Sequence, residues 1–174
     1  MPFYPGLGVG GHCIPDDPLY LYWKAKHHGF SSKFIKLSAD TNSQMPYYVA
    51  GCLREILKTK KKSTRKAKLL VIGVTYKKDV KDLRKSPALK LIEILQQRRY
   101  DVEYFDPIIP YLKIDRVDLR SIKLTPAAVA KYACVVIATD HSNVNYKLIL
   151  KHARLIYDIR NVYGHFKNAK IRKI

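Results

Sequence analysis

The first sixty residues carry a helical pattern of apolar positions. Between Thr41 and Lys60, apolar residues recur every three or four positions, the spacing of one face of an α-helix; they are Met45, Val49, Cys52, Leu53, Ile56 and Leu57. Pro46 either begins this helix or kinks it. A shorter helix is predicted from Pro18 to His28, with Asp17 as its N-cap and Pro18 as its first residue, positions that both residue types favour.

After residue 66 the pattern changes to short apolar runs separated by amphipathic stretches. Runs of this kind are typical of buried strands; they are AKLLVIGV (67–74), DVEYFD (101–106), ACVVIAT (133–139) and RLIYDI (154–159). The stretches between them have helical spacing, and two begin with the pairs Ser86-Pro87 and Thr125-Pro126, which are typical of N-cap and first helical residue. Strands that alternate with helices predict a parallel sheet with helices on its faces.

We therefore predict an α/β protein with two parts. A helical central region that carries the opening loop occupies residues 1–62, and a small Rossmann-like parallel-sheet domain occupies residues 63–174. A chain of 174 residues is long enough for one ordinary domain, or for a smaller domain with appended helices.

Ligands of such sheets bind beyond the carboxyl ends of the strands. The residues that follow the four predicted strands are Tyr76, Lys77 and Asp79; Asp106; Asp140 and His141; and Arg160 and Asn161. Lys77 and Arg160 suit a phosphate or a sugar hydroxyl. For either residue alone, the alternative is a strand-end cation that faces solvent.

The charge of the chain is strongly positive. It has 33 Lys and Arg residues against 14 Asp and Glu, a formal net charge of +19, which favours polyanionic partners. The run KTKKKSTRKAK (58–68) holds the densest cluster, but no RRM, zinc-finger or KH signature accompanies it. A solvated linker is the simpler interpretation and nucleic acid is not the expected partner. A basic module that binds nucleic acid or another polyanion without catalysis stays open as the alternative.

The cysteines and the lengths of the apolar runs indicate the cellular location. Cys13, Cys52 and Cys134 are widely spaced and form no CxxC, so neither a zinc site nor a disulfide framework is indicated. A reducing cytoplasm is the simplest location. No apolar run approaches the roughly 20 residues that cross a bilayer, and no signal-peptide pattern opens the sequence. We expect Cys52 and Cys134 to be core residues, because both lie in apolar patterns.

The opening loop PGLGVGGHCIPDDPLYLYW (5–23) combines glycines, a His-Cys pair, prolines and aspartates. Gly6, Gly8 and Gly11 formally satisfy the GxGxxG pattern of dinucleotide-binding loops. That pattern requires a strand before it and a helix directly after it. Nothing resembling a strand precedes this loop and Ile14-Pro15 is expected to interrupt a helix, so the dinucleotide interpretation is rejected. The predicted sheet domain offers only Gly73 after its first strand.

A metal site and a reactive thiol are the other interpretations of this loop. The potential ligands His12, Cys13, Asp16 and Asp17 are too close in sequence to converge readily on one ion, so no metal is expected. Cys13 lies in a glycine-rich loop just before a predicted helix, a setting that suits a nucleophilic thiolate. Asp17 would then be a base or a water-orienting group. A small buried cysteine and a helix-capping aspartate remain the alternative on these residues alone.

The segment PGLGVGGHCIPDDPLYL closely resembles the catalytic-cysteine motif of the UDP-glucose/GDP-mannose dehydrogenase family. The resemblance continues over essentially the whole chain, in NSQMPYYVAGCL, GVTYKKDVKDLRKSPALKLIEIL, VEYFDPIIP, VVIATDHS and YDIRNVYG. The combination of FYPG, GGHCIPDDP, WKAK and MPYYV is most similar to the branch that acts on UDP-N-acetylhexosamines, the UDP-GlcNAc and UDP-ManNAc 6-dehydrogenases.

The resemblance implies an architecture and a cofactor. Members of the family have an N-terminal NAD-binding domain, a central helical region for dimerisation and a C-terminal UDP-binding domain. This chain resembles only the second half, without the NAD fingerprint or the upstream catalytic lysine, asparagine and glutamate. We therefore expect a fragment that has no turnover alone, binds a UDP-sugar, uses NAD in its complete form and dimerises through the Thr41–Lys60 helix. A gene product that dimerises but performs no chemistry is a further possibility.

The resemblance also implies roles for individual residues. The family oxidises the C6 alcohol of the sugar twice: Cys13 would attack the intermediate aldehyde to form a thiohemiacetal, and water would hydrolyse the later thioester with help from Asp17. The substrate contacts implied are Tyr4, Gly8, Val9, Gly10, Gly11, Tyr76, Lys77 and Arg160, and Arg84 would contact NAD. Two departures are Leu7, where proline is usual, and Lys85, where an acidic residue is common and whose charge would make the surroundings of Arg84 more repulsive to cations.

Overall fold

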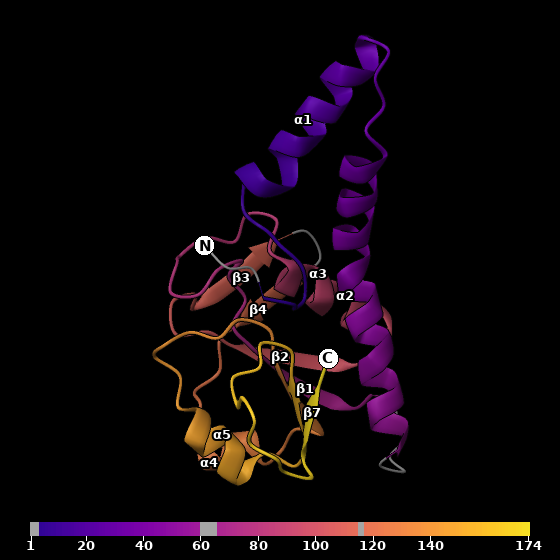
Figure 1. Cartoon of the computed structure of the whole chain (residues 1–174). Coiled ribbons are helices and arrows are strands. Elements are labelled where there is room, and N and C mark those ends of the chain that lie inside the picture. The colour runs from indigo at the N-terminus through magenta and orange to yellow at the C-terminus, as the bar shows by residue number, and fades with distance from the viewer. Residues whose placement is uncertain (1–3, 60–65, 115–116) are drawn as a thin grey trace.

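A long helical hairpin stands on a parallel α/β unit (Figure 1). The structure is a computed structural model that describes residues 4–59, 66–114 and 117–174. The hairpin consists of α1 (Cys13–His27) and α2 (Lys33–Thr59), and the second half of α2 lies beside the sheet. No residue of α1 is buried, so this helix contributes nothing to the main hydrophobic core. Among the described residues, no helix is both long and apolar enough to cross a membrane.

Within the described residues, five parallel strands form the main sheet in the order β2-β1-β5-β6-β7. They are β1 (Lys68–Ile72), β2 (Asp101–Phe105), β5 (Cys134–Ile137), β6 (Ile156–Asp158) and β7 (Ile171–Lys173). The connecting helices are α3 (Pro87–Gln97), α4 (Pro126–Val129) and α5 (Tyr146–His152). An antiparallel pair, β3 (Tyr111–Ile114) and β4 (Val117–Arg120), follows β2. This topology confirms the predicted α/β class with a Rossmann-like sheet.

The sheet is buried on both faces, as its continuous apolar runs predicted. Leu69 and Val71 of β1 belong to the core that α2 and α3 cover, whereas Leu70 and Ile72 belong to the core on the face of α4 and α5. Because side chains alternate along a strand, one short apolar run supplies both cores.

The apolar stripe predicted for the long helix faces the first of these cores. Val49, Leu53 and Leu57 of α2 are buried. Met45, Cys52 and Ile56 are partly buried and pack against the same core. Burial of each such side chain contributes roughly 1.5–3 kcal/mol, so this half of α2 is anchored to the sheet. The predicted boundary between residues 62 and 63 lies outside the described residues, and a division there stays a prediction.

The prediction for the first helix was wrong at its beginning. α1 begins at Cys13, so Asp17 lies inside the helix and is not its N-cap, and Pro18 lies in its interior. Pro15 did not interrupt the helix because it falls in the first turn, where its missing N–H would have had no intrahelical partner. A helix therefore does follow the glycines of the opening loop.

The long helix also begins earlier than predicted. α2 starts at Lys33 instead of near Thr41, and Pro46 is an interior residue. Lys36 and Asp40 form an ion pair one turn apart, at 2.7 Å, in this added segment. The polar stretch SADTNSQ (38–44) separates the exposed Phe34 and Leu37 of this segment from the apolar stripe that begins at Met45, which explains the missed residues.

Three short strands were not predicted. β3, β4 and β7 have the sequences YLKI, VDLR and IRK, in which charged residues interrupt the apolar pattern. β7 lies at the edge of the sheet and pairs only with β6 among the described strands. Edge strands bury fewer side chains and therefore give a weak sequence signal.

Replacement of Leu53 by alanine tests whether α2 is part of the core. Leu53 is 0% exposed, so Leu53→Ala should lower the free energy of unfolding by about 3 kcal/mol through lost burial and a residual cavity. Urea denaturation followed by circular dichroism measures this change. The matched control is Leu37→Ala, in the projecting half of the same helix, where Leu37 is 64% exposed; it should change the free energy by less than about 0.5 kcal/mol. Equal effects would contradict the packing described.

Candidate functional site

A cleft of about 390 Å³ lies beyond the carboxyl ends of the strands, under the opening loop. Its lining includes seven of the residues for which the family resemblance implied a substrate contact: Tyr4, Gly8, Val9, Gly10, Tyr76, Lys77 and Arg160. The segments after β1, β5 and β6 each contribute to it, and Ile14 of α1 also lines it. Residues far apart in the sequence are therefore brought together at one edge of the sheet.

The opening loop approaches the segment after β1 so closely that side chains would not fit. A Cβ added to Gly10 would lie 2.4 Å from the carbonyl oxygen of Lys85 and 2.9 Å from Cβ of Tyr76. Gly11 has a φ of +97°, and a Cβ there would lie 2.9 Å from Cε2 of the same tyrosine. The Gly11 N–H also donates to the carbonyl oxygen of Arg84 at 2.9 Å. These two glycines therefore allow the loop to lie directly on the Tyr76 ring.

Asn42 of α2 holds the same loop from the other side. Its Oδ1 accepts a hydrogen bond from the Val9 N–H at 2.7 Å, and its Nδ2 donates to the Val9 carbonyl at 2.9 Å. The side-chain amide thus bonds both backbone groups of Val9, as a neighbouring strand would, and holds the loop in position. Asn42 was not predicted as a site residue, because an amide side chain on a helix gives no sign in the sequence of a partner 33 residues away.

Cys13 and Asp17 lie on α1 beside the cleft, not among its lining residues. Cys13 is the first residue of the helix and is exposed, with Sγ 3.9 Å from Nδ1 of His12. Asp17 is exposed in the following turn. Cys134, by contrast, is buried in β5, and burial raises the pKa of its thiol to about 12, so it stays an inert thiol at neutral pH. Cys52 is only half-buried, so the prediction of a core residue holds fully for Cys134 alone.

Of the cations that line the cleft, Arg160 has a carboxylate partner. Nε of Arg160 lies 3.1 Å from Oδ1 of Asp140, which follows the neighbouring strand β5. This bond uses Nε and leaves the terminal nitrogens of the guanidinium free of that carboxylate. The guanidinium also lies close to the opening loop, since a Cβ added to Gly6 would be 2.9 Å from Nη1. Lys77 is exposed at the mouth, and Lys78, which the sequence analysis did not select, also lines the cleft.

Arg84 and Lys85 each have a separate acidic partner. Nε of Arg84 donates to both carboxylate oxygens of Asp82, at 3.1 and 3.0 Å. This pairing lowers the pKa of Asp82 and raises the pKa of Arg84. Lys85 forms an ion pair with Asp16 of α1. The expectation that Lys85 makes the surroundings of Arg84 repulsive to cations is therefore not supported, because acidic residues balance both charges.

A buried polar cluster lies beneath the cleft. Asp106 accepts hydrogen bonds from the backbone N–H groups of Val74 at 2.8 Å, Ile108 at 2.8 Å and Ile109 at 3.0 Å. Burial by itself raises the pKa of this carboxyl, but hydrogen bonds from His141 and these backbone groups outweigh it, so the pKa lies below its ordinary value. Asp106 and His141 thus support the strand ends and do not line the cleft.

The turn after β1 does not form a dinucleotide cradle. Gly73 has a φ of +78°, and a Cβ there would lie 2.3 Å from the carbonyl oxygen of Thr139. This glycine therefore serves the close approach of β1 and β5, not the approach of a phosphate. The described residues do not fit a complete NAD site. Within the described ranges, no group of three or more His, Cys, Asp or Glu side chains could hold a metal ion.

Most of the basic run at 58–68 lies outside the described residues, which omit 60–65. Two of its described lysines have acidic neighbours. Nζ of Lys58 lies 3.1 Å from Oε1 of Glu55, and Nζ of Lys68 lies 3.1 Å from Oε1 of Glu103. These pairs reduce the positive charge available at those two positions.

The fold and the cleft together define a Rossmann-like domain with a ligand site at the carboxyl edge of its sheet. The sequence profile of the UDP-glucose/GDP-mannose dehydrogenase family, UDP binding domain, matches residues 70–165. The profile of the family's central domain matches residues 1–44. The chain belongs to the UDP-glucose/GDP-mannose dehydrogenase family, as its motifs indicated.

The chain is also similar in sequence to individual members of the family. The chain is 37% identical over 163 residues to the UDP-N-acetyl-D-mannosamine dehydrogenase of Pyrococcus horikoshii. The aligned region covers 91% of this chain and 36% of that protein. It is 33% identical over 171 residues to the enzyme of the same name from Methanococcus vannielii, covering 92% of this chain and 37% of that protein. The chain thus spans a little over a third of the length of these relatives.

A solved structure agrees with the computed one over almost the whole chain. The structure of UDP-D-ManNAc dehydrogenase from Pyrococcus horikoshii superposes with a TM-score of 0.81 at 33% sequence identity. The superposition covers 99% of this chain and 40% of that one. The helical hairpin and the sheet are therefore arranged in this chain much as they are in a larger dehydrogenase.

Substitution of Gly10 tests the contact between the opening loop and the segment after β1. An added methyl group at Gly10 meets backbone at 2.4 Å, so Gly10→Ala should destabilise the protein by about 1–3 kcal/mol as the loop is displaced. Chemical denaturation measures this change.

The matched control for Gly10→Ala is Gly51→Ala. An added Cβ at Gly51 in α2 meets no atom within 4 Å, so this substitution should stabilise the protein by about 0.5–1 kcal/mol. Destabilisation by Gly51→Ala equal to that by Gly10→Ala would show that the close contact at Gly10 does not decide the result.

Proposed function

We propose that this chain is the catalytic-cysteine and substrate-binding part of an NAD-dependent UDP-sugar 6-dehydrogenase. The substrate would be a UDP-N-acetylhexosamine, and the complete enzyme would oxidise its C6 alcohol to a carboxylate. The observation that carries the proposal is the cleft itself, where Lys77 and Arg160 meet the glycine loop that leads to Cys13. Membership of the family and the names of the two archaeal relatives support the choice of substrate class.

The cleft has the chemistry that a nucleoside diphosphate sugar requires. Arg160 and Lys77 would bind the diphosphate, because guanidinium and ammonium groups form strong, charge-assisted hydrogen bonds to phosphate oxygens. Tyr76 offers an aromatic surface, and Gly8, Val9, Gly10 and Gly11 would present backbone groups to the sugar, with Tyr4 at the entrance. This arrangement would direct C6 of the sugar towards the start of α1.

Cys13 would be the nucleophile. As the first residue of α1 it lies where the helix stabilises negative charge, and it is exposed to a substrate in the neighbouring cleft. Its thiolate would add to the C6 aldehyde to give a thiohemiacetal; oxidation of that adduct leaves a thioester, which water hydrolyses to the carboxylate and the free thiol. Asp17, one turn further along α1, would assist the water and the associated proton transfer.

NAD would supply the acceptor for the hydride in each oxidation. This chain contributes Arg84 as a proposed contact to it, since the guanidinium is 63% exposed. Other residues of the complete enzyme would supply the rest of the NAD site.

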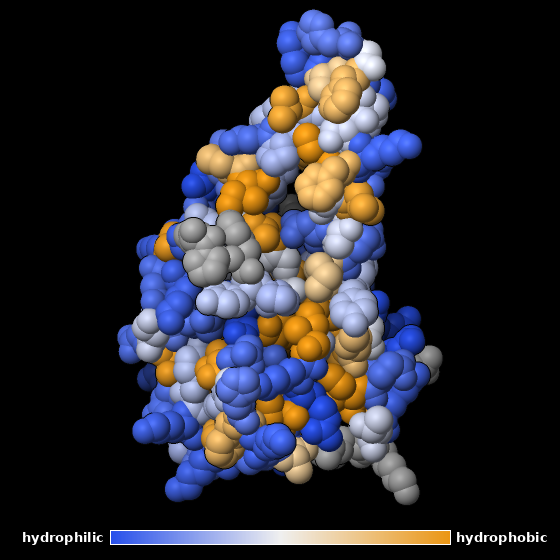
Figure 2. All heavy atoms as spheres, viewed as in Figure 1, coloured by the Kyte–Doolittle hydropathy of each residue, from blue (hydrophilic) through white to orange (hydrophobic). Residues whose placement is uncertain are grey.

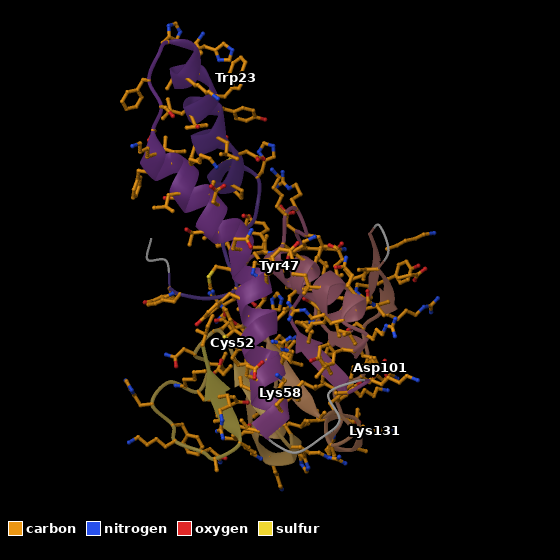
Figure 3. All side chains as sticks on the ribbon, turned by 90° about the vertical axis from the view of Figure 1, so that its right-hand side faces the viewer. Trp23, Tyr47, Cys52, Lys58, Asp101 and Lys131 are labelled. Carbon is orange, nitrogen blue, oxygen red and sulfur yellow. The ribbon has the colours of Figure 1, made fainter. Side chains whose placement is uncertain are left out.

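The complete protein would be a homodimer. The family resemblance implied the Thr41–Lys60 helix as the interface, but Val49, Leu53 and Leu57 of that helix are buried in the core of their own chain, so the other exposed apolar residues of the hairpin would supply it. Exposed apolar side chains gather on the hairpin, as Figure 2 shows at its upper end; they are Leu19, Tyr20, Leu21, Trp23, Phe30, Phe34 and Leu37. Figure 3 shows Trp23 near the tip of the hairpin and Tyr47 further along α2. Apolar surface of this extent is typical of an interface.

Calorimetric titration with UDP-N-acetylglucosamine or UDP-N-acetylmannosamine tests the binding proposal. The chain should bind one of them saturably, and Lys77→Ala or Arg160→Ala should each weaken binding by at least about tenfold, because each removes a charge-assisted bond. Cys13→Ala should leave the affinity nearly unchanged.

The matched control is Lys131→Ala. This exposed lysine, labelled in Figure 3, precedes β5 and so lies at the end of the sheet opposite the cleft; its replacement should change the affinity by less than about twofold. An equal effect of all three cation substitutions would point to general electrostatic attraction. Salt-sensitive binding to duplex DNA without any response to the UDP-sugar would favour the polyanion-binding alternative.

We expect the isolated chain to show no reduction of NAD in the presence of the UDP-sugar. The physical reason is the missing dinucleotide cradle, since turnover needs a bound hydride acceptor close to C6. Absorbance at the wavelength of the reduced nicotinamide measures this directly. Measurable turnover that Cys13→Ala abolishes would contradict the expectation and show that this chain binds NAD productively.

A further inference from the structure

His141 is a buried ionisable side chain for which the proposed chemistry has no role. It follows β5, has a relative exposure of 0%, and lies outside the lining of the cleft. Its two ring nitrogens both contact residues of neighbouring strand ends. The protonation of each nitrogen is fixed by what it contacts, because a backbone N–H can only donate a hydrogen bond.

The contacts of the ring define one neutral tautomer. Nδ1 accepts a hydrogen bond from the backbone N–H of Asp79 at 3.0 Å, so Nδ1 carries no proton. Nε2 lies 3.1 Å from Oδ2 of Asp106 and 3.1 Å from Oγ1 of Thr75. The Thr75 hydroxyl donates its own proton to the carbonyl oxygen of Lys77 at 2.9 Å, so its oxygen is an acceptor for Nε2. The proton of the imidazole therefore lies on Nε2, shared between two acceptors.

The same contacts hold a segment that lines the cleft. Thr75, Tyr76, Lys77 and Lys78 all line it, and Asp79 ends the segment in a left-handed conformation with a φ of 58°. This conformation costs a residue other than glycine roughly 1 kcal/mol or more, so it persists where the surroundings hold it.

Two sets of bonds hold Asp79 in this conformation. Its N–H donates to His141, and its carboxylate accepts from the N–H and the hydroxyl of Ser142, at 2.8 and 2.7 Å. At the other end of the segment, the Thr139 hydroxyl donates to the Thr75 carbonyl at 2.7 Å. Residues after β5 thus fix both ends of the segment after β1.

We propose that His141, as the neutral tautomer with its proton on Nε2, is a positioning residue for the substrate cleft. It fixes the backbone from Thr75 to Asp79, and through it the side chains of Tyr76 and Lys77, without touching the ligand. The consequence for UDP-sugar binding rests on the proposed function, whereas the effect on the backbone segment does not.

Among the described residues, two carboxylates lie within 3.5 Å of the ring nitrogens, and one titratable hydroxyl bonds the backbone of His141. Asp106 lies at Nε2, Oδ1 of Asp79 lies 3.5 Å from Nδ1, and the Tyr146 hydroxyl donates to the His141 carbonyl oxygen at 3.2 Å. A proton on Nδ1 would oppose the Asp79 N–H, donor against donor, and would require the Asp79 segment to rearrange. The position of the proton and the order of the segment are therefore linked.

Nitrogen-15 NMR of the imidazole in the ligand-free chain tests the tautomer. The expected spectrum has a protonated Nε2 and an unprotonated, pyridine-like Nδ1 near neutral pH. A protonated Nδ1, either as the other neutral tautomer or as an imidazolium, would overturn the proposal.

Two variants separate the two nitrogens. Asparagine places its amide oxygen close to where Nδ1 lies, so His141→Asn can still accept from the Asp79 N–H. Glutamine places its amide near Nε2, so His141→Gln can still donate to Asp106 but leaves the Asp79 N–H without its acceptor. Each variant loses one buried hydrogen bond, so the two should be similarly destabilised.

Hydrogen exchange and affinity then decide the role. In the ligand-free protein, exchange of the Asp79 amide should be at least about tenfold faster in His141→Gln than in His141→Asn, because only the asparagine keeps its acceptor. UDP affinity should fall at least about tenfold in His141→Gln and less than about threefold in His141→Asn. Equal exchange and equal affinity in the two variants would assign His141 to general packing and overturn the proposal. If the unaltered chain did not bind UDP, the proposed function would fail, whereas the exchange rates would still support or overturn the positioning of the segment.

Discussion

The contact between the opening loop and the segment after β1 is the constraint on which the site depends. Gly10 and Gly11 lie so close to Tyr76 that a Cβ at either would come within 2.9 Å of that residue. Asn42 of α2 and the carbonyl oxygen of Arg84 complete the attachment. Because α1 begins directly after these glycines, the same contact sets where Cys13 lies relative to the cleft. The proposed nucleophile Cys13 and the cleft are thereby connected through the backbone, not through long side chains.

Much of the architecture followed from periodicity. The four apolar runs each contain a strand, and the stripe from Met45 to Leu57 faces the core, because burial imposes a regular spacing on apolar residues. The strand-end rule also selected Tyr76, Lys77 and Arg160, which line the cleft. The elements that escaped prediction give weaker signals. The strands β3, β4 and β7 are only three or four residues long, and the apolar Phe34 and Leu37 in the first turns of α2 are exposed.

The errors at the site have a different cause. Asp17 was predicted as a helix cap from its neighbour Pro18, but the helix starts earlier, at Cys13, because Pro15 is tolerated in a first turn. The roles of Asn42 and His141 depend on partners 33 and 62 residues away. Long-range hydrogen bonds of this kind are decided by the three-dimensional fold, and no local pattern announces them. Only the family resemblance connected the opening loop with the sheet before the structure did.

Above all, we propose that the strand ends and the opening loop form a single site for a UDP-sugar. Two-dimensional amide NMR of the chain during a titration with UDP tests it most directly, because every part of the molecule reports at once. We predict shifts confined to the opening loop at 8–11, the segment at 75–79, the segment after β5 at 138–140 and Arg160. Shifts concentrated along the basic residues around 58–68, with the cleft unaffected, would contradict the claim.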